Sequence, residues 1–320
     1  MVNFLYCFDS NYNDQAFSSM ISILDNTSTD IKLYIIHKNE INKEFIPREI
    51  KKHENLEKLT VYKFNSNHKE FPNIENAHVS EATYYRIFFD EYLDEEIKSI
   101  VYIDADIICN KDPSKLINEF TNDLINSEYV ISAKTEFKKN KNTIKDFERI
   151  KLKSTKYFNA GFLLIDINKW KRNNIKNKLL ELFNIIDFEL TAWDQDLLNH
   201  FIDGNYNELP NELNLNINLE KNYKKHELKK LYEETIFFHF YGKVKPWVSR
   251  GLFTKNSEIY QNNFRKISKL KYHIEHRYIR SSLYFLFKSF FTLRFIDIKY
   301  KLNFLRIFFL EAIKKKAIKE

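Results

Sequence analysis

The chain has little of what secreted, disulfide-rich or membrane-spanning proteins carry. It holds only two cysteines in 320 residues, Cys7 and Cys109. At most one disulfide can therefore form, and this scarcity favours a reducing compartment. No charge-free apolar stretch approaches the ~18–20 residues that a membrane-spanning helix needs. The apolar run that begins at Val2 is too short for a signal peptide and lacks a basic leader, so we expect a cytoplasmic protein.

Glycine and proline are also rare, with 4 and 5 residues, whereas 43% of the residues are hydrophobic and 16% aromatic. Such a chain can bury a full core, which suits one large domain with an appendage. The net charge of +7 is uneven: residues 265–320 hold 15 Lys/Arg against 4 Asp/Glu, and the rest holds 36 against 40. We predict a main domain over 1–255 and a basic, aromatic tail over 256–320 whose charge suits an anionic partner.

Apolar runs rich in β-branched residues alternate with longer amphipathic stretches through the first two-thirds of the chain. This alternation predicts an α/β fold with a largely parallel sheet covered by helices on both faces. Ligands of such sheets lie beyond the carboxyl ends of the strands, so the residues after each strand form the candidate site. The expected strands are 4–8, 32–36, 60–64, 99–103, 129–133 and 161–165, and the expected helices are 14–24, 47–53 and 83–93.

The most informative motif is Asp104-Ala105-Asp106, which directly follows the apolar run 99–103. Two carboxylates at i and i+2 after a strand can face one pocket, and their oxygens suit a hard divalent ion that also binds a diphosphate. Such an ion makes the diphosphate a better leaving group. Because Asp-x-Asp is also common in solvated turns and helix caps, the motif alone leaves both interpretations open.

A second motif, from His239 to Trp247, follows an expected strand at 236–238. The imidazole of His239 can complete a metal site made of carboxylates. Gly242 lets the backbone approach a phosphate, for which Lys245 supplies a positive charge. The alternative is a buried structural histidine followed by a turn. Two of the 4 glycines, Gly161 and Gly242, fall in candidate motifs, which favours a positional requirement at both.

Other polar residues suited to a nucleotide sugar lie at the ends of the remaining strands and helices. Asn159 offers an amide to sugar hydroxyls, and Arg86 offers a cation to a diphosphate. Each has an ordinary structural alternative: a loop residue, an exposed helical arginine, or an acidic residue paired with a helix dipole. The full set comprises Asp9, Asn11, Arg86, Asn159, Asp194 and Gln195.

Taken in order, these motifs resemble glycosyltransferase family 8, the retaining group that includes lipopolysaccharide galactosyl- and glucosyltransferases and glycogenin. The likeness covers residues 2–247 and is greatest for the bacterial lipooligosaccharide α-galactosyltransferases. It implies a GT-A fold that binds a UDP-hexose with Mn²⁺ as cofactor, or Mg²⁺ as the alternative. By motif match, the metal ligands would be Asp104, Asp106 and His239.

The resemblance also assigns the residues that bind the donor. Some would line the uridine pocket, others would hold the diphosphate, and the remainder would surround the sugar and the metal. In that order they are Cys7, Asp9, Asn11 and Tyr12; Gly242 and Lys245; and Arg86, Ala105, Asn159, Ala160, Gly161, Asp194 and Gln195.

The same resemblance bears on mechanism, because it places Gln195 below the anomeric carbon. Retaining hydrolases commonly use a carboxylate nucleophile, and an amide is a poor one. We therefore favour departure and attack on one face of the sugar, with Gln195 stabilising positive charge and Asp194 as the carboxylate alternative. The family often has a small residue at the position of Phe8. After the strand 129–133 it can carry an acceptor-facing Asp, for which Glu136 is the nearest candidate.

Basic and aromatic residues interleave in the tail, and Leu283, Leu286, Phe287 and Phe290 fall on one helical face. A basic, aromatic amphipathic helix typically lies in the headgroup region of anionic membranes. Each basic residue near the surface contributes about 1 kcal/mol of attraction. The alternative is a helical appendage packed on the main domain or on a second subunit. We favour membrane association.

The resemblance implies a retaining hexosyltransferase, and the basic tail places it at the inner face of the plasma membrane. It would move a hexose from a UDP-sugar to a lipid-linked or cell-surface saccharide such as lipopolysaccharide. The alternative is a non-catalytic, membrane-attached protein that binds sugar nucleotides or acts as a scaffold. Nucleic-acid binding is not expected, because the main domain is mildly acidic and carries no recognition motif. The choice between galactose and glucose, the acceptor, the linkage and the oligomeric state stay open.

Overall fold

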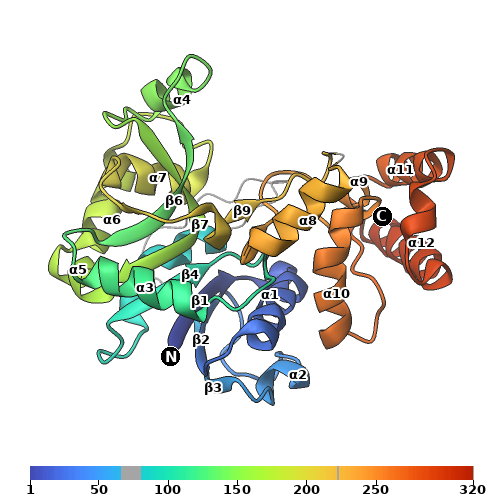
Figure 1. Cartoon of the computed structure of the whole chain (residues 1–320), viewed down its shortest axis with the longest axis horizontal. Coiled ribbons are helices and arrows are strands. Elements are labelled where there is room, and N and C mark those ends of the chain that lie inside the picture. Colours follow the sequence, from blue (N-terminus) through green and yellow to red (C-terminus); the bar gives the residue numbers. More distant parts are fainter. Residues whose placement is uncertain (66–80, 222, 320) are drawn as a thin grey trace.

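The computed structural model describes residues 1–65, 81–221 and 223–319. At its centre lies a 7-stranded sheet in the order β3-β2-β1-β4-β7-β6-β8 (Figure 1). The first four strands in this order are mutually parallel, β7 is antiparallel to β4 and β6, and β8 is parallel to β6. The strands are β1 (Val2–Phe8), β2 (Ile31–His37), β3 (Leu56–Lys63), β4 (Ser99–Ile103), β6 (Ile131–Lys138), β7 (Lys156–Asp166) and β8 (Asn207–Glu208).

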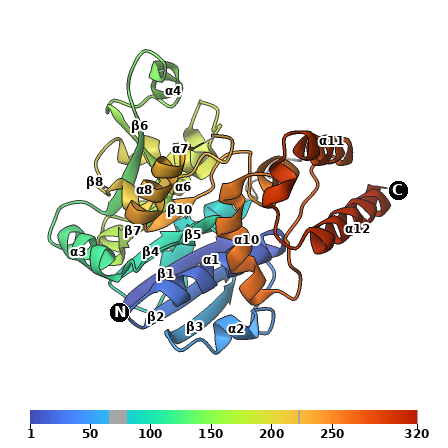
Figure 2. The same cartoon turned by 45° about the vertical axis from the view of Figure 1, so that its right-hand side comes forward.

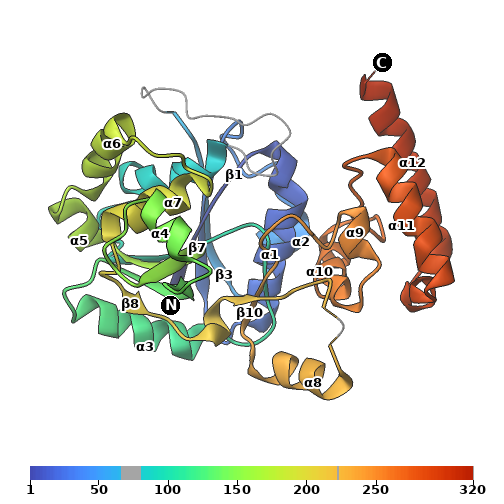
Figure 3. The ribbon, with the colours of Figure 1, turned by 90° about the horizontal axis from the view of Figure 1, so that it is seen from above.

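Helices cover both faces of this sheet, as the view from above shows (Figure 3). Side chains alternate between the faces along each strand, so Phe4 and Tyr6 of β1 join one buried cluster and Leu5 joins the other. The first cluster includes side chains of α1 (Asn13–Asn26), α2 (Arg48–Lys51) and α3 (Ser114–Ile125). The second includes side chains of η2 (Glu81–Glu91), α5 (Ile167–Arg172), α6 (Ile175–Ile185) and α7 (Trp193–Ile202). A further short helix, α4 (Ile144–Arg149), lies between β6 and β7.

A second, 3-stranded sheet positions the candidate site. It has the order β5-β10-β9, with β5 at Ile107–Cys109, β10 at Phe237–His239 and β9 at Leu215–Asn216. β10 runs antiparallel to β5, and His239 pairs with Ile107. Because β5 follows β4 after a short turn, this pairing brings a histidine from late in the chain to the end of β4.

The predicted α/β fold with a mainly parallel sheet is confirmed, but several elements differ from expectation. The strands expected over 129–133 and 60–64 are Ile131–Lys138 and Leu56–Lys63. The segment expected as a helix over 83–93 is a 3₁₀ helix, and most of its aromatic side chains are buried, so packing rather than propensity sets its geometry. The helix expected over 47–53 is shorter and follows Pro47. The strand expected over 161–165 begins at Lys156, which places Asn159 inside β7 rather than in a preceding loop.

The C-terminal third contains α8 (Lys225–Glu234), α9 (Ser249–Leu252), α10 (Glu258–Ile267), α11 (Ile279–Phe291) and α12 (Lys301–Lys319). α10, which the charge-based boundary puts in the tail, packs beside α1 and buries Tyr260 and Phe264 around Trp247 (Figure 2). α11 and α12 lie away from the central sheet (Figures 1 and 3) and share a separate cluster with Leu252 and Phe253. No described helix is both long and apolar enough to span a membrane.

The apolar face expected in the tail is divided in the structure. Leu286 is buried and Leu283 half-buried in the cluster shared with α9, whereas Phe287 and Phe290 are exposed. The tail therefore both packs on the rest of the chain and presents aromatic side chains to the outside, so the two alternatives considered for it are not exclusive.

Candidate active site

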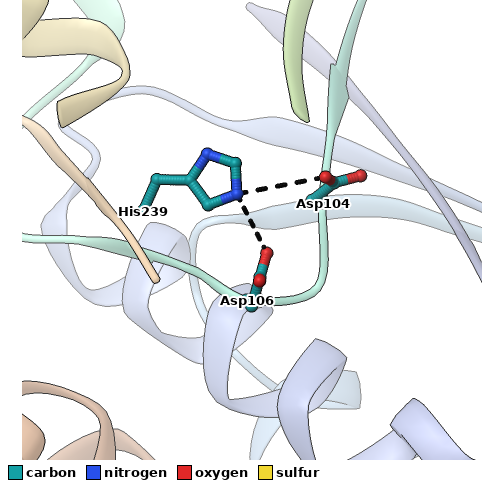
Figure 4. A group of neighbouring side chains, drawn as sticks. All are labelled: Asp104, Asp106 and His239. Atoms are coloured by element: carbon teal, nitrogen blue, oxygen red, sulfur yellow. Dashed lines mark ion pairs between the residues drawn. The ribbon is translucent and has the colours of Figure 1, made fainter. Parts of the chain in front are cut away.

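Two carboxylates from one turn and a histidine from late in the chain meet at the end of β4 (Figure 4). Asp104 and Asp106 lie in the turn between β4 and β5, and His239 ends β10. His239 Nε2 lies 3.2 Å from Asp106 Oδ1 and 4.0 Å from Asp104 Oδ2. One ligand atom from each residue falls within 4.8 Å of the other two. The structure thus brings together the three residues that the sequence motifs proposed as metal ligands.

The surroundings of this cluster fit a divalent cation. Two carboxylate oxygens and one imidazole nitrogen form a donor set suited to Mn²⁺ and related ions. Gly161 in β7 lies against the same cluster, and a Cβ atom there would lie 2.4 Å from His239 Cε1 and 2.6 Å from Asp104 Oδ2. Only glycine leaves room for both side chains at this position. The positional requirement expected at Gly161 is thus explained by the side chains of two candidate metal ligands that lie against it.

A buried cation adjoins the cluster. Lys245 Nζ contacts Asp106 Oδ2 and donates a hydrogen bond to the carbonyl of Phe240 at 2.7 Å. Burial acts to raise the pKa of Asp106, but the positive charge of Lys245 and the contact with His239 outweigh it and hold this pKa well below its usual range. Asp106 is therefore ionised at neutral pH, and a metal ion or phosphate entering here would rearrange this ion pair.

Arg86 forms a second buried charge cluster on the opposite side of Asp104. Its Nη2 lies 3.2 Å from Asp104 Oδ1 and its Nε lies 2.8 Å from Asp194 Oδ2. The guanidinium stacks over the ring of Tyr102 at 4.0 Å, and the hydroxyl of Tyr102 donates to Asp104 Oδ1 at 2.6 Å. The default alternative for this arginine, an exposed position on a helix, is wrong, because Arg86 is buried.

Asp194 has one carboxylate oxygen that is buried without a hydrogen-bond donor in the described part of the chain. Although Arg86 Nε lies close to this Oδ2, its hydrogen points at the carbonyl of Thr83, 2.9 Å away. Burial raises the pKa of Asp194 to about 6, against the opposing effects of Arg86 and the hydrogen bond from Thr83. A buried carboxylate oxygen that has an ion-pair partner but no hydrogen-bond donor suits a ligand hydroxyl as donor.

The amide of Gln195 is held in one orientation. Its Oε1 accepts a hydrogen bond from the backbone N–H of Ala160 at 2.8 Å, and its Nε2 donates to Glu136 Oε2 and to the hydroxyl of Tyr157, both at 3.2 Å. Asp196, the last residue of the Asp194-Gln195-Asp196 motif, has no exposed surface and forms an ion pair with Arg149. The motif therefore sends two side chains into the pocket and one into the protein.

A single cavity of about 330 Å³ joins these groups. Its walls contain every residue predicted for the metal, diphosphate and sugar positions, together with Cys7 and Tyr12 from the uridine set. Asp9 and Asn11 are not among the lining residues: Asp9 accepts a hydrogen bond from the backbone N–H of Asn11, and the side chain of Asn11 is exposed. Glu136, the nearest candidate for the acceptor-facing acid, also lines the cavity. The lining residues that the sequence analysis did not single out as site residues are Phe8, Ala82, Thr83, Tyr102, Thr191, Ala192, Trp193 and Tyr241.

Sequence comparison agrees with this geometry. The profile of Glycosyl transferase family 8 matches residues 3–251. The chain belongs to this family. The family 8 chain is 30% identical over 268 residues to General stress protein A of Bacillus subtilis, an alignment that covers 78% of this chain and 88% of that protein. It is 29% identical over 252 residues to a lipopolysaccharide 1,2-glucosyltransferase of Escherichia coli, covering 77% of this chain and 72% of that protein.

Solved structures show the same fold for this family 8 glycosyltransferase. The galactosyltransferase LgtC, solved with donor and acceptor sugar analogues, superposes with a TM-score of 0.64 at 18% identity. The match covers 84% of this chain and 97% of LgtC. The chain therefore has a GT-A glycosyltransferase fold and carries a candidate metal site within it.

Proposed function

We propose that this chain is a retaining hexosyltransferase that moves galactose or glucose from a UDP-sugar to a saccharide acceptor of the cell surface, such as lipopolysaccharide. The observation that carries the proposal is the convergence of Asp104, Asp106 and His239 in one pocket with the buried ammonium of Lys245. This combination suits a diphosphate whose charge is shared between a metal ion and a lysine. The named lipopolysaccharide glucosyltransferase among its relatives supports the choice of acceptor class.

Within this proposal, Asp104, Asp106 and His239 hold Mn²⁺ or Mg²⁺, which would act as a Lewis acid on the departing diphosphate. Lys245 and Gly242, whose φ of 86° orients the backbone of the turn, hold the diphosphate. Cys7 near the end of β1 and Tyr12 in the 3₁₀ helix that follows would border the uridine. These groups bind and orient the donor so that the bond between the anomeric carbon and the UDP oxygen can break.

We assign the sugar end of the pocket to the residues around Asp194 and Gln195. The Oδ2 of Asp194, which has no hydrogen-bond donor among the described residues, would accept a hydrogen bond from a sugar hydroxyl. Gln195 would stabilise the positive charge that develops at the anomeric carbon, with attack on the face from which UDP departs. In this step the acceptor oxygen bonds to the anomeric carbon, UDP leaves with the bonding electrons, and a UDP phosphate oxygen takes the acceptor proton. A solved LgtC form described as an active-site glutamine mutant supports attention to Gln195.

The test of the proposal is a screen of UDP-sugars for release of UDP with Mn²⁺, with Mg²⁺ and with a chelator. Metal-dependent turnover of UDP-galactose or UDP-glucose is expected, with retention of configuration in the transferred sugar as read by NMR. Gln195→Ala is expected to lower kcat by about 10²–10³-fold, the usual effect of removing one group that stabilises transition-state charge. Near-normal turnover in both Gln195→Ala and Asp194→Asn would overturn the catalytic assignment. Tight UDP-sugar binding without turnover would favour the non-catalytic alternative.

We also propose that the tail holds the enzyme at an anionic membrane surface. On α11, Tyr284, Phe287 and Phe291 follow each other at helical spacing and are exposed, with Phe291 at 87%. The opposite side of the same helix, with Leu286, is buried against the rest of the chain. Exposed aromatic side chains among lysines and arginines suit the headgroup region of a membrane.

A further inference from the structure

Two buried asparagines connect the imidazole of His239 to the backbone of β7. Asn214 Oδ1 lies 2.8 Å from His239 Nδ1, and Asn214 Nδ2 donates to Asn159 Oδ1 at 2.9 Å. The backbone N–H of Gly161 donates to the same Asn159 Oδ1 at 3.0 Å. Asn214 lies in the segment before β9, which the sequence motifs did not mark, and only 2% of its surface is exposed.

The backbone N–H of Gly161 sets the direction of every hydrogen bond in this network from Gly161 to His239. A backbone N–H can only donate, so Asn159 must turn its carbonyl toward Gly161. The group that Asn214 turns toward that carbonyl must then be its NH₂, which leaves its own carbonyl facing His239. A carbonyl can only accept, so the hydrogen in this contact belongs to Nδ1 of His239.

A carboxylate at the other side of Asn159 imposes the same direction. Asn159 Nδ2 donates to Glu136 Oε2 at 3.1 Å, and the same oxygen accepts from Gln195 Nε2 at 3.2 Å. Reversing the amide of Asn159 would set its oxygen against a carboxylate oxygen and its NH₂ against the N–H of Gly161. The N–H of Gly161 and the carboxylate of Glu136 therefore independently favour the same orientation of the Asn159 amide.

We propose that Asn214 is a positioning residue of the metal centre: its carbonyl accepts the hydrogen of His239 Nδ1 and so orients the ring with Nε2, the atom that can bind a metal, toward Asp104 and Asp106. This inference rests on the metal site of the proposed function. Nε2 is the ring atom nearest the two carboxylates, so the tautomer set by Asn214 is the one that can donate to a metal. Partners of this kind fix the ring orientation of metal-bound histidines, and their loss typically lowers metal affinity about 10- to 100-fold.

The first test reads the tautomer directly and needs no sugar nucleotide. Long-range ¹H–¹⁵N spectra of metal-free protein labelled at histidine should show a proton on Nδ1 of His239. Loss of one signal set in His239→Gln assigns the residue among the 9 histidines. In Asn214→Ala the Nδ1–H form should lose its dominance. A bare Nδ1 in the wild-type protein would overturn the proposal without any variant having to fold.

The second test measures Mn²⁺ binding by calorimetry in the absence of donor. Asn214→Ala should weaken binding about 10- to 100-fold. Asn211→Ala removes an exposed amide from the same segment and should bind as the wild type does, so it controls for changes in the loop. Equal affinity in the two variants would overturn the positioning role of Asn214. A wild-type chain that binds no Mn²⁺ would instead count against the metal site itself, while the tautomer measurement still decides the role of Asn214.

Discussion

At the scale of single residues, Gly161 is the position where one added carbon has the largest expected effect on the site. A Cβ there would lie within 2.6 Å of both His239 and Asp104, so one of these side chains must move. We expect Gly161→Ala to weaken Mn²⁺ binding at least about tenfold, as other losses of ligand orientation do, and to lower transferase activity with it.

Gly204→Ala is the matched control for this change. Its Cβ would also meet a close neighbour, Ser154 Cβ at 2.5 Å, and its φ of 79° is unfavourable for alanine, so it should destabilise the fold. Gly204 does not line the pocket. Calorimetry with Mn²⁺ on the two variants separates the effects: weak binding in both would mean that general destabilisation, and not the contact with the ligands, causes the loss.

The buried carboxyl of Asp194 predicts a pH dependence of stability. Because burial raises its pKa to about 6 in the folded chain, the native state binds the proton more tightly than the unfolded state, whose value is near 3.9. The stabilising contribution is therefore full below about pH 4 and is lost as the pH rises through about 6. The free energy of unfolding of the wild type, measured in urea, should fall across this interval relative to Asp194→Asn. A constant difference between the two proteins would contradict the raised pKa.

Most of the site residues could be predicted because the motifs stand at the ends of strands, where ligands bind in such sheets. The lining residues without such a mark could not. Tyr102 belongs to a strand buried on both faces, so no alternation tells which of its side chains faces the pocket. Asn214 contacts His239 across 25 residues of sequence, and a lone asparagine near a two-residue strand carries no local signal of that contact.

At the scale of elements, the periodicity of apolar residues and the composition predicted the parallel strands well and the irregular elements poorly. β7 shows the reason. The register of its pairing with β6 shifts between Ala133 and Lys134, opposite the segment that contains Gly161. β7 therefore continues through an irregularity at which the regular pairing is interrupted. A pattern of period two cannot show where partner strands slip, because the partner is not adjacent in the sequence.

The exposed stripe of α11 predicts how the tail should respond to mutation. Phe287 and Phe291 contribute little to the core because they are exposed, so replacing both with serine should leave thermal stability near that of the wild type. Burial of a phenylalanine side chain in an apolar environment is worth about 1.5–3 kcal/mol. The double variant should therefore bind anionic phosphatidylglycerol vesicles at least about tenfold more weakly in a flotation assay.

Ile185→Ser provides the control for this experiment, since Ile185 is 76% exposed on α6, outside the tail. It should bind the vesicles as the wild type does. Equal vesicle binding by all three proteins would contradict insertion of the α11 aromatics. Binding that disappears at high salt in every protein would assign the attraction to lysines and arginines alone.

At the scale of the whole molecule, packing and charge divide the chain at different places. The boundary predicted from composition follows residue 255, yet α10 lies beyond it and packs beside α1, where Tyr260 and Phe264 are buried around Trp247 and Lys266 forms an ion pair with Asp25 at 2.5 Å. Loss of one buried phenylalanine side chain costs about 3–5 kcal/mol, and a domain is stable by only about 5–15 kcal/mol. A chain that ends at residue 255 should therefore be largely unfolded, whereas one that ends at residue 277 keeps α10 and loses the segment that contains α11 and α12. Thermal unfolding and UDP-sugar turnover of the two truncated chains test this: the longer one should retain both and fail to bind vesicles. A cooperative transition in the shorter chain at the wild-type temperature would show that α10 is dispensable and that the boundary set by charge is also the physical one.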